Sequence, residues 1–317
     1  MKEILSWKNR ELVPSKSLGT SAWDAHYFFG WAVFDAFRTY NHKILGLEYH
    51  LDRFYRSAKL SGIDISLSKE KLILEIEKLM DVNKELFKDD EYRFMVFASP
   101  GKFKIYDDLG DASPNLTIQL TTTSRYSTFI YPNLEKGWTS LITHQKQIPS
   151  RFFDVRIKSC SRLHYGMADL ECKQFDEPTN PILLDEHGNL CESSGANIAF
   201  IKNGIVYIPK GTDMLDGITM KYLKTSLDYM GIEYKEGIYK PYDLIDCNGI
   251  LYTSTFSGIT PSYKLVYNSQ TYNLHKDDTY NKILEGFSKV VGVDVKTQWK
   301  TWYERKWSNW YERITSN

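Results

Sequence analysis

The sequence has no excess of either charge, few cysteines and no long hydrophobic stretch. Its 40 basic residues balance 40 acidic ones, so nothing in the composition indicates a nucleic-acid or membrane-surface partner. The longest apolar run extends only from Tyr27 to Phe34, far below the ~20 residues that a membrane-spanning helix needs. The first residues, Met1 to Lys8, lack the apolar core of a signal peptide. These absences predict a soluble, cytoplasmic protein.

The cysteines give no sign of a disulfide framework or a metal centre. Cys160, Cys172, Cys191 and Cys247 are widely spaced and form no C-x-x-C pair, so reduced thiols are expected and no metal site is predicted. The chain has 317 residues, of which 42% are hydrophobic and 25% charged. This composition is ordinary for a globular protein, and the length allows two domains.

Hydrophobic periodicity predicts an irregular mixture of strands and helices. Paired strands are expected within residues 30–47, with strands over 31–34 and 37–40 on either side of Asp35 and Ala36 and a turn at Asn41 and His42. The later expected strands are 92–98, 116–121, 138–143, 181–184, 197–201, 205–208 and 250–253, and the expected helices are 50–60, 68–80, 161–175 and 218–230. Because strands outnumber helices without regular alternation, an α+β fold in two domains is favoured over a doubly wound sheet.

A polar segment rich in Thr and Ser divides the chain and is predicted to be the interdomain linker. The expected parts are a small N-terminal α/β domain (1–121), the linker (122–136), a large cofactor-binding domain (137–292) and an aromatic-rich C-terminal extension (293–317). In the extension, four tryptophans recur at helical spacing: Trp299, Trp302, Trp307 and Trp310. This spacing predicts a helix that packs on its own domain or a partner subunit, with membrane or peptide binding as the alternative.

Lys158 is the strongest candidate for chemistry. It stands between the apolar residues Val155, Ile157 and Leu163, and an apolar setting favours the neutral amine. A neutral amine is the form that attacks a carbonyl carbon to make a Schiff base. A lysine in an amphipathic strand, with its amine in water, is the structural alternative.

Further segments predict anion binding and a buried carboxylate. Gly217, Ile218 and Thr219 begin a helix, where free amide groups and a hydroxyl can bind a phosphate. A second turn rich in hydroxyls begins at Ser254 and Thr255, and Arg53 offers a guanidinium fork. Glu192 precedes a loop of small residues, where a carboxylate could approach a flat heterocycle. Helix caps, turns and surface residues are the structural alternatives for each.

Six segments of the chain, taken in order, resemble one enzyme family. Residues 30–40 look like the motif G-x-x-[VL]-[FY]-E-x-[IL]-R-x-Y, 50–58 like H-L-x-R-L-x-x-S-A, and 184–198 like L-D-x-x-G-x-[VI]-x-E-x-x-x-x-N. Residues 157–159, 217–219 and 253–261 complete the set. The pattern resembles the class IV (fold type IV) pyridoxal-phosphate aminotransferases, a family that includes branched-chain and D-amino-acid aminotransferases and aminodeoxychorismate lyase.

The resemblance implies an active site between two domains and a role for each candidate residue. Lys158 would bind pyridoxal 5′-phosphate as a Schiff base and shuttle a proton. Glu192 would face the pyridine nitrogen and keep it protonated, which stabilises the carbanion. The other cofactor-binding residues would be Arg53, Ile218, Thr219, Ser254 and Thr255. The candidates for holding the substrate carboxylate are Arg38, Arg93 and the amides near Phe256.

Departures from the family motifs leave the substrate open. Met220 replaces an arginine that is common in the family, and Asp35 stands where the family usually has Glu. The residues after Lys158 are closer to the D-amino-acid and lyase branches, whereas the opening segment around Arg38 is closer to the branched-chain enzymes. Tyr165 lies two positions beyond the branched-chain tyrosine, so no ring contact is assigned to it.

The favoured hypothesis is a transaminase that moves an amino group between an amino acid, with a branched-chain-like substrate preferred, and a 2-oxo acid by ping-pong exchange. The alternatives on the same fold are aminodeoxychorismate lyase and D-amino-acid aminotransferase activity. A binding protein that kept the fold and lost the chemistry is the third hypothesis. A homodimer is the assembly that the resemblance implies.

Overall fold

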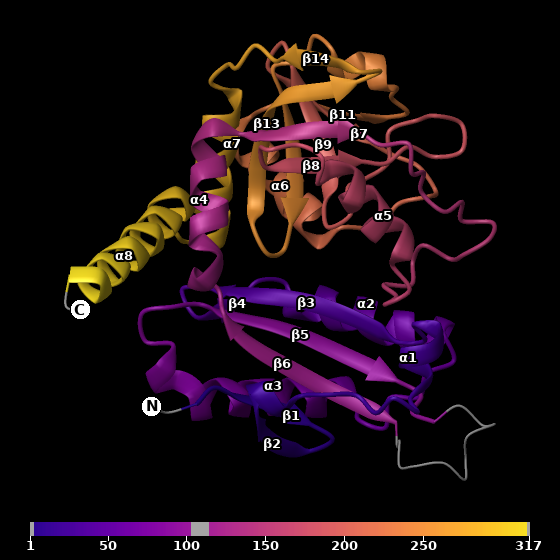
Figure 1. The fold of residues 1–317 in the computed structure, drawn as a ribbon, viewed down its shortest axis with the longest axis vertical. Helices are drawn as coiled ribbons and strands as arrows, with labels where there is room; N and C mark the ends of the chain where they lie inside the picture. Colours follow the sequence, from indigo (N-terminus) through magenta and orange to yellow (C-terminus); the bar gives the residue numbers. More distant parts are fainter. Residues whose placement is uncertain (1–2, 103–113, 316–317) are drawn as a thin grey trace. The chain divides into compact units, whose positions relative to one another are not determined.

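The computed structural model describes residues 3–102 and 114–315, with side chains in the last helix described up to residue 306. The chain folds into two compact units: unit 1 comprises Met1–Thr123 and Arg156–Arg162, and unit 2 comprises Ser124–Val155 and Leu163–Asn317. Each unit has its own sheet and helices (Figure 1). The predicted α+β fold in two domains is therefore confirmed.

Unit 1 is built on a six-stranded sheet with the order β2-β1-β6-β5-β3-β4. All its neighbouring strands pair antiparallel. The strands are β1 (Leu5–Lys8), β2 (Glu11–Pro14), β3 (Val33–Tyr40), β4 (Lys43–Ile44), β5 (Tyr92–Ser99) and β6 (Asn115–Thr122). The helices are α1 (Ala25–Phe29), α2 (Leu47–Leu60) and α3 (Lys69–Asn83), with short 3-10 turns η1 (Ser15–Ser17) and η2 (Lys84–Leu86).

The core of unit 1 lies between one face of this sheet and the helices α2 and α3. Leu51 and Phe54 of α2 and Leu72 and Ile76 of α3 are fully buried in one cluster with sheet residues such as Phe94. Their spacing places one apolar stripe of each helix on the sheet. Because strand side chains alternate, the opposite face of the sheet holds a different set of residues.

Residues 31–40 were predicted as two short strands around Asp35, and that prediction is wrong. They form the single strand β3, which pairs with β5 from Val33 to Arg38. The chain reverses later, at Asn41 and His42, where φ is 50° and 58°. Asp35 did not form a turn because its side chain is fully buried and bonded to α2.

Unit 2 contains an eight-stranded mixed sheet with the order β11-β10-β9-β12-β13-β7-β8, and β14 pairs with β13. The strands are β7 (Trp138–Ile142), β8 (Thr179–Ile182), β9 (Asn197–Lys202), β10 (Ile205–Pro209), β11 (Tyr234–Gly237), β12 (Gly249–Ser254), β13 (Gly258–Tyr267) and β14 (Gln270–Asn273). The helices are α4 (Ser127–Lys136), α5 (Leu163–Cys172), α6 (Ile218–Met230), α7 (Thr279–Val291) and α8 (Val295–Thr315), with 3-10 turns η4 (Ser124–Tyr126) and η5 (Pro241–Leu244).

The two clearest local predictions in unit 2 are confirmed. Asn203 and Gly204, with φ of 53° and 75°, make the turn of the β9–β10 hairpin. The helix expected over 218–230 is α6, and Gly231 ends it in the left-handed conformation. In both places a residue that tolerates positive φ stands where the chain needs it.

The segment predicted as a linker is largely helical. Residues 124–136 form η4 and α4 and are grouped with unit 2. Pro132 lies inside α4, and the helix packs against α8. The segment Arg156–Arg162, which was expected in the large domain, is instead grouped with unit 1. Both differences arise from contacts with segments distant in sequence.

Three general observations accompany the fold. None of the helices in the described part of the chain combines the length and apolar character that crossing a bilayer requires. Across residues 3–102 and 114–315, no cluster of three or more His, Cys, Asp or Glu side chains is arranged to hold a metal ion. All four cysteines are free thiols.

Candidate functional site

Lys158 lies in a short extended segment that is bound to the end of β3. Phe34 N donates to Lys158 O (3.0 Å), and Cys160 N donates to Ala32 O (2.8 Å). Lys158 Nζ lies 5.0 Å from the centroid of the Phe34 ring. The backbone of Lys158 is therefore fixed on both sides of the residue, while the amine ends a long side chain over an aromatic face.

The surroundings of Lys158 differ in part from the apolar setting that the sequence predicted. Ile157 packs against the core of unit 1 as expected. Leu163, however, is 79% exposed, because it begins helix α5 and points into solvent. The apolar neighbour that the structure supplies is the Phe34 ring, which no local sequence pattern places beside the lysine.

Helix α2 positions both Lys158 and Arg53. The fully buried Ser57 Oγ donates to Arg53 O (2.8 Å) and accepts from Lys158 N (3.0 Å). One hydroxyl thus bonds the helix backbone at Arg53 and the segment that carries the lysine. No role was predicted for Ser57, although it is the S of the H-L-x-R-L-x-x-S-A motif.

Arg53 is held by a buried carboxylate and a histidine, and these three residues are called the Arg53 cluster: Asp35, His50 and Arg53. Arg53 Nε donates to Asp35 Oδ2 (2.7 Å), and Arg53 Nη2 donates to Asp35 Oδ1 (2.8 Å). His50 Nδ1 lies 2.7 Å from the same Oδ1. Asp35 and His50 are at most 1% exposed, and Arg53 is 4% exposed. The two bonds to Asp35 fix the guanidinium in one orientation.

Burial and charge act in opposite directions on the Arg53 cluster. Burial alone would raise the pKa of Asp35, but the charge and hydrogen bonds of Arg53 and the hydrogen bond from His50 lower it below its ordinary value. Burial lowers the pKa of His50, against the hydrogen bond to Asp35 that favours its protonated form. Asp35 is therefore a carboxylate at neutral pH, and a neutral His50 is favoured.

Arg38 and Arg93 lie directly opposite each other on neighbouring strands β3 and β5. They belong to the face of the sheet that points away from the α2–α3 core, and this surface is called the Arg38 face. The register places ten residues on it: Phe34, Ala36, Arg38, Tyr40, Arg93, Met95, Phe97, Thr117, Gln119 and Thr121. The face thus combines two cations with the apolar side chains of Phe34, Met95 and Phe97.

The two arginines on the Arg38 face are held in different ways. The guanidinium of Arg38 is fully buried, and its Cζ lies 4.0 Å from the centroid of the Tyr40 ring. Arg93 is half-buried and reaches Met95 Sδ at 3.5 Å. Like charges in directly opposed strand positions repel. An anion bound at this face would offset that repulsion.

The Phe34–Phe97 pair is the apolar end of the same face. The two rings stack with centroids 5.9 Å apart. A cavity of about 170 Å³ within unit 1 includes Phe97, Thr117 and Gln119 among its lining residues, together with His26. The face therefore offers cations near Arg38 and an apolar, partly hollow region near Phe97.

Glu192, in unit 2, is a buried carboxylate held by four neutral donors. Its Oε1 accepts from Tyr165 Oη (2.6 Å) and Gln147 Nε2 (2.8 Å). Its Oε2 accepts from Asn197 Nδ2 (3.1 Å) and Leu215 N (3.1 Å). The side chain is 5% exposed. These bonds fix the carboxylate in one orientation without neutralising it.

Asn197 connects Glu192 to the start of helix α6. Its Nδ2 donates both to Glu192 Oε2 and to Leu215 O (2.9 Å), just before α6 begins. Gly217 precedes the helix, and a Cβ added there would meet Asn197 Oδ1 at 1.8 Å. Only glycine allows this close approach. The predicted anion site at Ile218 and Thr219, which are both buried, therefore shares its support with Glu192.

Ser254, Thr255 and Phe256 belong to the tight turn that joins β12 to β13, called here the 254–257 turn. Ser257 N donates to Ser254 Oγ (3.2 Å), and the hydroxyls of the two serines lie 2.9 Å apart. The Phe256 ring packs edge-on against Tyr126, with centroids 4.4 Å apart. Ser254 thus closes the turn, while Phe256 points its side chain toward η4.

Other positioning residues were missed by sequence analysis. Gln147 belongs to no motif, so no local pattern could have identified it. Tyr165 was left without a role, and its hydroxyl binds Glu192. Asn197 was identifiable, because it is the final N of the motif over 184–198.

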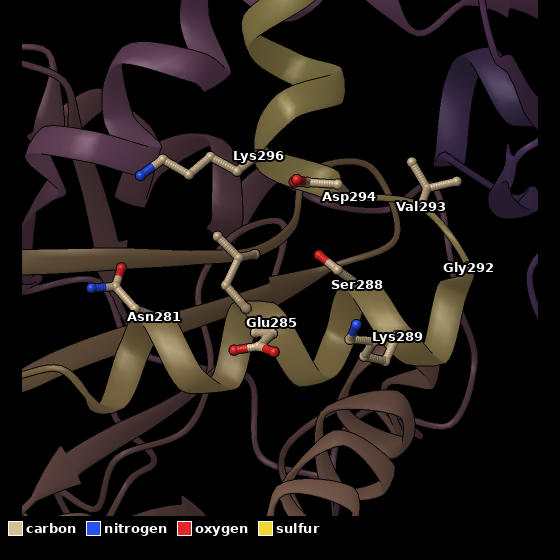
Figure 2. Close-up of a pocket in the computed structure, with 9 residues that line it drawn as sticks. Asn281, Glu285, Ser288, Lys289, Gly292, Val293, Asp294 and Lys296 are labelled. Atoms are coloured by element: carbon tan, nitrogen blue, oxygen red, sulfur yellow. The ribbon is translucent and has the colours of Figure 1, made fainter.

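Another cavity in unit 2 lies away from the candidate site residues. Its volume is about 540 Å³. Its lining residues come from α7, the start of α8 and the loop between them (Figure 2). Its charged lining residues have both signs: Glu285, Lys289, Asp294 and Lys296. None of the predicted site residues lines it, so it takes no part in the candidate site.

Known proteins are similar to this chain over most of its length. Residues 32–264 match the family model described as amino-transferase class IV. A putative branched-chain-amino-acid aminotransferase of Methanocaldococcus jannaschii is 27% identical over 297 residues, covering 92% of this chain and 96% of that protein. A D-alanine aminotransferase of Staphylococcus aureus is 26% identical over 267 residues, covering 81% of this chain and 87% of that protein.

Solved structures share the fold. The branched-chain aminotransferase of Thermoproteus uzoniensis with norvaline aligns with a TM-score of 0.78 and 20% identity, covering 95% of this chain and 98% of that chain. A second branched-chain amino acid aminotransferase (T.th.), complexed with N-(5′-phosphopyridoxyl)-L-glutamate, aligns with a TM-score of 0.77, 20% identity and the same coverage. The chain therefore belongs to the class IV aminotransferases, enzymes that use pyridoxal phosphate to move an amino group between an amino acid and a 2-oxo acid.

Proposed function

We propose that Lys158 is the lysine that binds pyridoxal phosphate, and that the enzyme transfers the amino group of a branched-chain-like amino acid to a dicarboxylic 2-oxo acid. The single observation that carries the lysine assignment is its anchored backbone, which leaves only the side chain to move. The Arg38 face, with two cations and three large apolar side chains, supports the substrate assignment.

The residues present fit the chemistry of pyridoxal phosphate. The cofactor has a phosphate, an aldehyde and a ring nitrogen that works best when protonated. Arg53, Thr219, Ser254, Thr255 and the Ile218 amide are donors suited to a phosphate. Glu192 is a buried carboxylate bound by neutral donors and is thus suited to a protonated ring nitrogen. We assign these residues to the cofactor.

When bound, the cofactor supplies an aldehyde that takes up the amino group and a conjugated ring that withdraws electrons from the α-carbon. Lys158 would hold the cofactor through its amine at that aldehyde, and the same amine is the base that would take a proton from the substrate α-carbon. Glu192 holds the proton on the ring nitrogen, because a fixed carboxylate favours the cationic ring. Arg53, oriented by Asp35, holds the phosphate so that the reacting groups keep their positions.

The Arg38 face accounts for two kinds of substrate in one site. In a ping-pong transaminase an amino acid and a 2-oxo acid occupy one site in turn. The substrates proposed here have an apolar side chain in one half-reaction and a second carboxylate in the other. Phe34, Met95 and Phe97 can contact an apolar side chain, while Arg38 and Arg93 can bind a carboxylate. We assign the carboxylate of the substrate to these arginines and to the amides near Phe256.

Transfer from D-amino acids is the second candidate, because a D-alanine aminotransferase is similar over 81% of the chain. Aminodeoxychorismate lyase activity is not favoured, since the relatives reported above are named aminotransferases. Initial rates with L-leucine, L-valine, D-alanine and D-leucine, with 2-oxoglutarate as acceptor, separate the candidates. A dominant rate with D-alanine would refute the branched-chain assignment. Pyruvate release from aminodeoxychorismate without an acceptor would refute transamination.

A homodimer, which acts in the cytoplasm, is the proposed assembly. An exposed aromatic patch at the end of α1 supports it: Tyr27, Phe28, Phe29 and Trp31 are 73%, 48%, 55% and 37% exposed. Contiguous apolar surface of this kind fits a protein interface, and a second copy of the chain is the proposed occupant. Reducing conditions fit the four free thiols. Light scattering of wild type and of Phe29→Ser would test the dimer, and a monomeric wild type would refute it.

The lysine assignment is tested by trapping the cofactor. Borohydride reduction of the yellow enzyme, followed by digestion and mass spectrometry, should place the pyridoxyl group on the peptide that contains Lys158. Lys158→Ala should not trap cofactor and should lose at least about 10³-fold in transamination rate. Lys43→Ala, which changes an exposed lysine of the same unit, is the control. Undiminished turnover in Lys158→Ala would refute the assignment.

A further inference from the structure

Helix α8 lies beyond the part of the chain that matches the family model and runs beside α4 (Figure 1). Two contacts fix their relative direction. Lys296 Nζ lies 2.9 Å from a Glu135 carboxylate oxygen, and the rings of Tyr303 and Tyr131 have centroids 5.1 Å apart. Residue numbers rise along α8 as they fall along α4, so the two helices are antiparallel.

The buried face of α8 continues into the candidate site through a chain of aromatic rings. Trp299 is fully buried and packs edge-on against Phe256, with centroids 6.3 Å apart. On its other side Trp299 packs edge-on against Trp302 at 5.2 Å. Phe256 in turn packs edge-on against Tyr126 at 4.4 Å. The four rings connect the C-terminal helix to the 254–257 turn.

Helix α8 also holds the other side of the Tyr126–Phe256 contact. Lys306 Nζ donates to Arg125 O (2.9 Å), in the 3-10 turn that carries Tyr126. One helix therefore contacts both partners of the ring pair, Phe256 through Trp299 and the backbone before Tyr126 through Lys306. A rigid helix with two such contacts restricts the directions in which the turn can move.

We propose that Trp299 is a positioning residue: it holds the Phe256 ring and thereby keeps the 254–257 turn in the geometry that binds the cofactor phosphate and the substrate carboxylate. The inference rests on the proposed function of Thr255 and of the amides near Phe256. Within the turn, Ser257 N donates to Ser254 Oγ, and the hydroxyls of these two serines lie within hydrogen-bonding distance of each other. The packing of Trp299 from α8 against Phe256 adds a contact from outside the turn.

Hydrogen exchange in the apo-protein tests the positioning without cofactor or substrate. Trp299→Leu should speed exchange of the amides in the 254–257 turn by about three- to tenfold, the change that loss of one edge-to-face ring contact allows. Trp138→Leu is the matched control, because Trp138 is a buried tryptophan of the same unit whose ring contacts Phe129. It should destabilise the protein without affecting the turn. Equal exchange in the two variants would overturn the inference.

Kinetics and binding provide the second test. In Trp299→Leu the KM for the amino donor and the Kd for pyridoxal phosphate should rise about three- to tenfold, with kcat within about twofold, because a loosened binding turn weakens ground state and transition state alike. Trp299→Phe, which keeps an aromatic edge, should restore most of both values. A loss confined to kcat or to melting temperature would overturn the inference.

A double variant tests whether Trp299 acts through Phe256. In a Phe256→Leu background, Trp299→Leu should change the KM little further, because the contact is already lost. Full additivity would overturn the inference. If Trp299→Leu speeds exchange in the turn as expected but the wild-type protein never binds pyridoxal phosphate, the proposed function fails. The support of the turn by α8 then still stands.

Discussion

Asp35→Asn is expected to destabilise the elements around α2 by about 3–5 kcal/mol, because it leaves a buried guanidinium without its ion pair. Asp35 is fully buried, and its Oδ2 accepts from Arg53 Nε. Its Oδ1 accepts from Arg53 Nη2 and Ala36 N and lies 2.7 Å from His50 Nδ1. Asparagine has nearly the same volume but only one acceptor oxygen, so its amide group would face a donor. Burial of Arg53 prevents water from replacing the lost bonds.

Hydrogen exchange of the apo-protein measures this loss locally. Peptides from α2 and β3 should lose protection equivalent to about 3–5 kcal/mol, while peptides from β9 and β12 should keep theirs. Asp52→Asn is the control on the same helix, since the Asp52–Lys69 pair is substantially exposed, and it should cost below about 1 kcal/mol. Asp35→Glu keeps the charge but adds a methylene, so it should cost about 1–3 kcal/mol. If Asp35→Asn behaves like Asp52→Asn, the buried Asp35–Arg53 pair does not stabilise the elements around α2.

Three further outcomes are expected. Glu192→Gln should lower the rate of the first half-reaction by at least about 10²-fold with little change in fold, because an amide does not favour the protonated ring nitrogen. Stopped-flow spectroscopy measures this rate, and an unchanged rate would contradict the role of Glu192. Gly217→Ala should weaken cofactor binding, because its Cβ would displace Asn197. Gly166→Ala is the control, since a Cβ there meets open space. Equal Kd values for pyridoxal phosphate in the two variants would refute the prediction. Melting temperature should fall as pH falls below about 6.5, because burial lowers the pKa of His50 from its ordinary value of 6.5 and the unfolded chain then binds more protons; His50→Gln should flatten this dependence.

The pattern of neighbouring residues was sufficient to predict the elements whose bounds are set by local signals. Helix α6 was predicted with its observed bounds, since its apolar stripe and terminal glycine are both local signals. The Asn203-Gly204 hairpin was predicted for the same reason. Helix α4 was missed because Ser, Thr, Phe, Tyr and an internal proline are weak helix formers, and packing against α8 outweighs that preference.

The candidate site could be predicted as a set of residues but not as an arrangement. The motifs identified Lys158, Arg53 and Glu192, because each stands at a fixed place in a short pattern. The partners of these residues come from distant segments. Gln147, which binds Glu192, belongs to no motif. Phe34 belongs to the motif over residues 30–40, but nothing in that motif places its ring beside Lys158.

The sequence by itself determined the chemistry available to this protein: an amine, a carboxylate, guanidinium groups and a helix start suited to a phosphate, in the order of one enzyme family. Tertiary structure alone decided the register that sets Arg38 opposite Arg93, the burial that joins Asp35 to Arg53, and the ring contacts between α8 and the 254–257 turn. The physical reason is that periodicity and turn preference act over a few neighbouring residues, whereas strand register and side-chain packing depend on segments that meet only when the chain is folded.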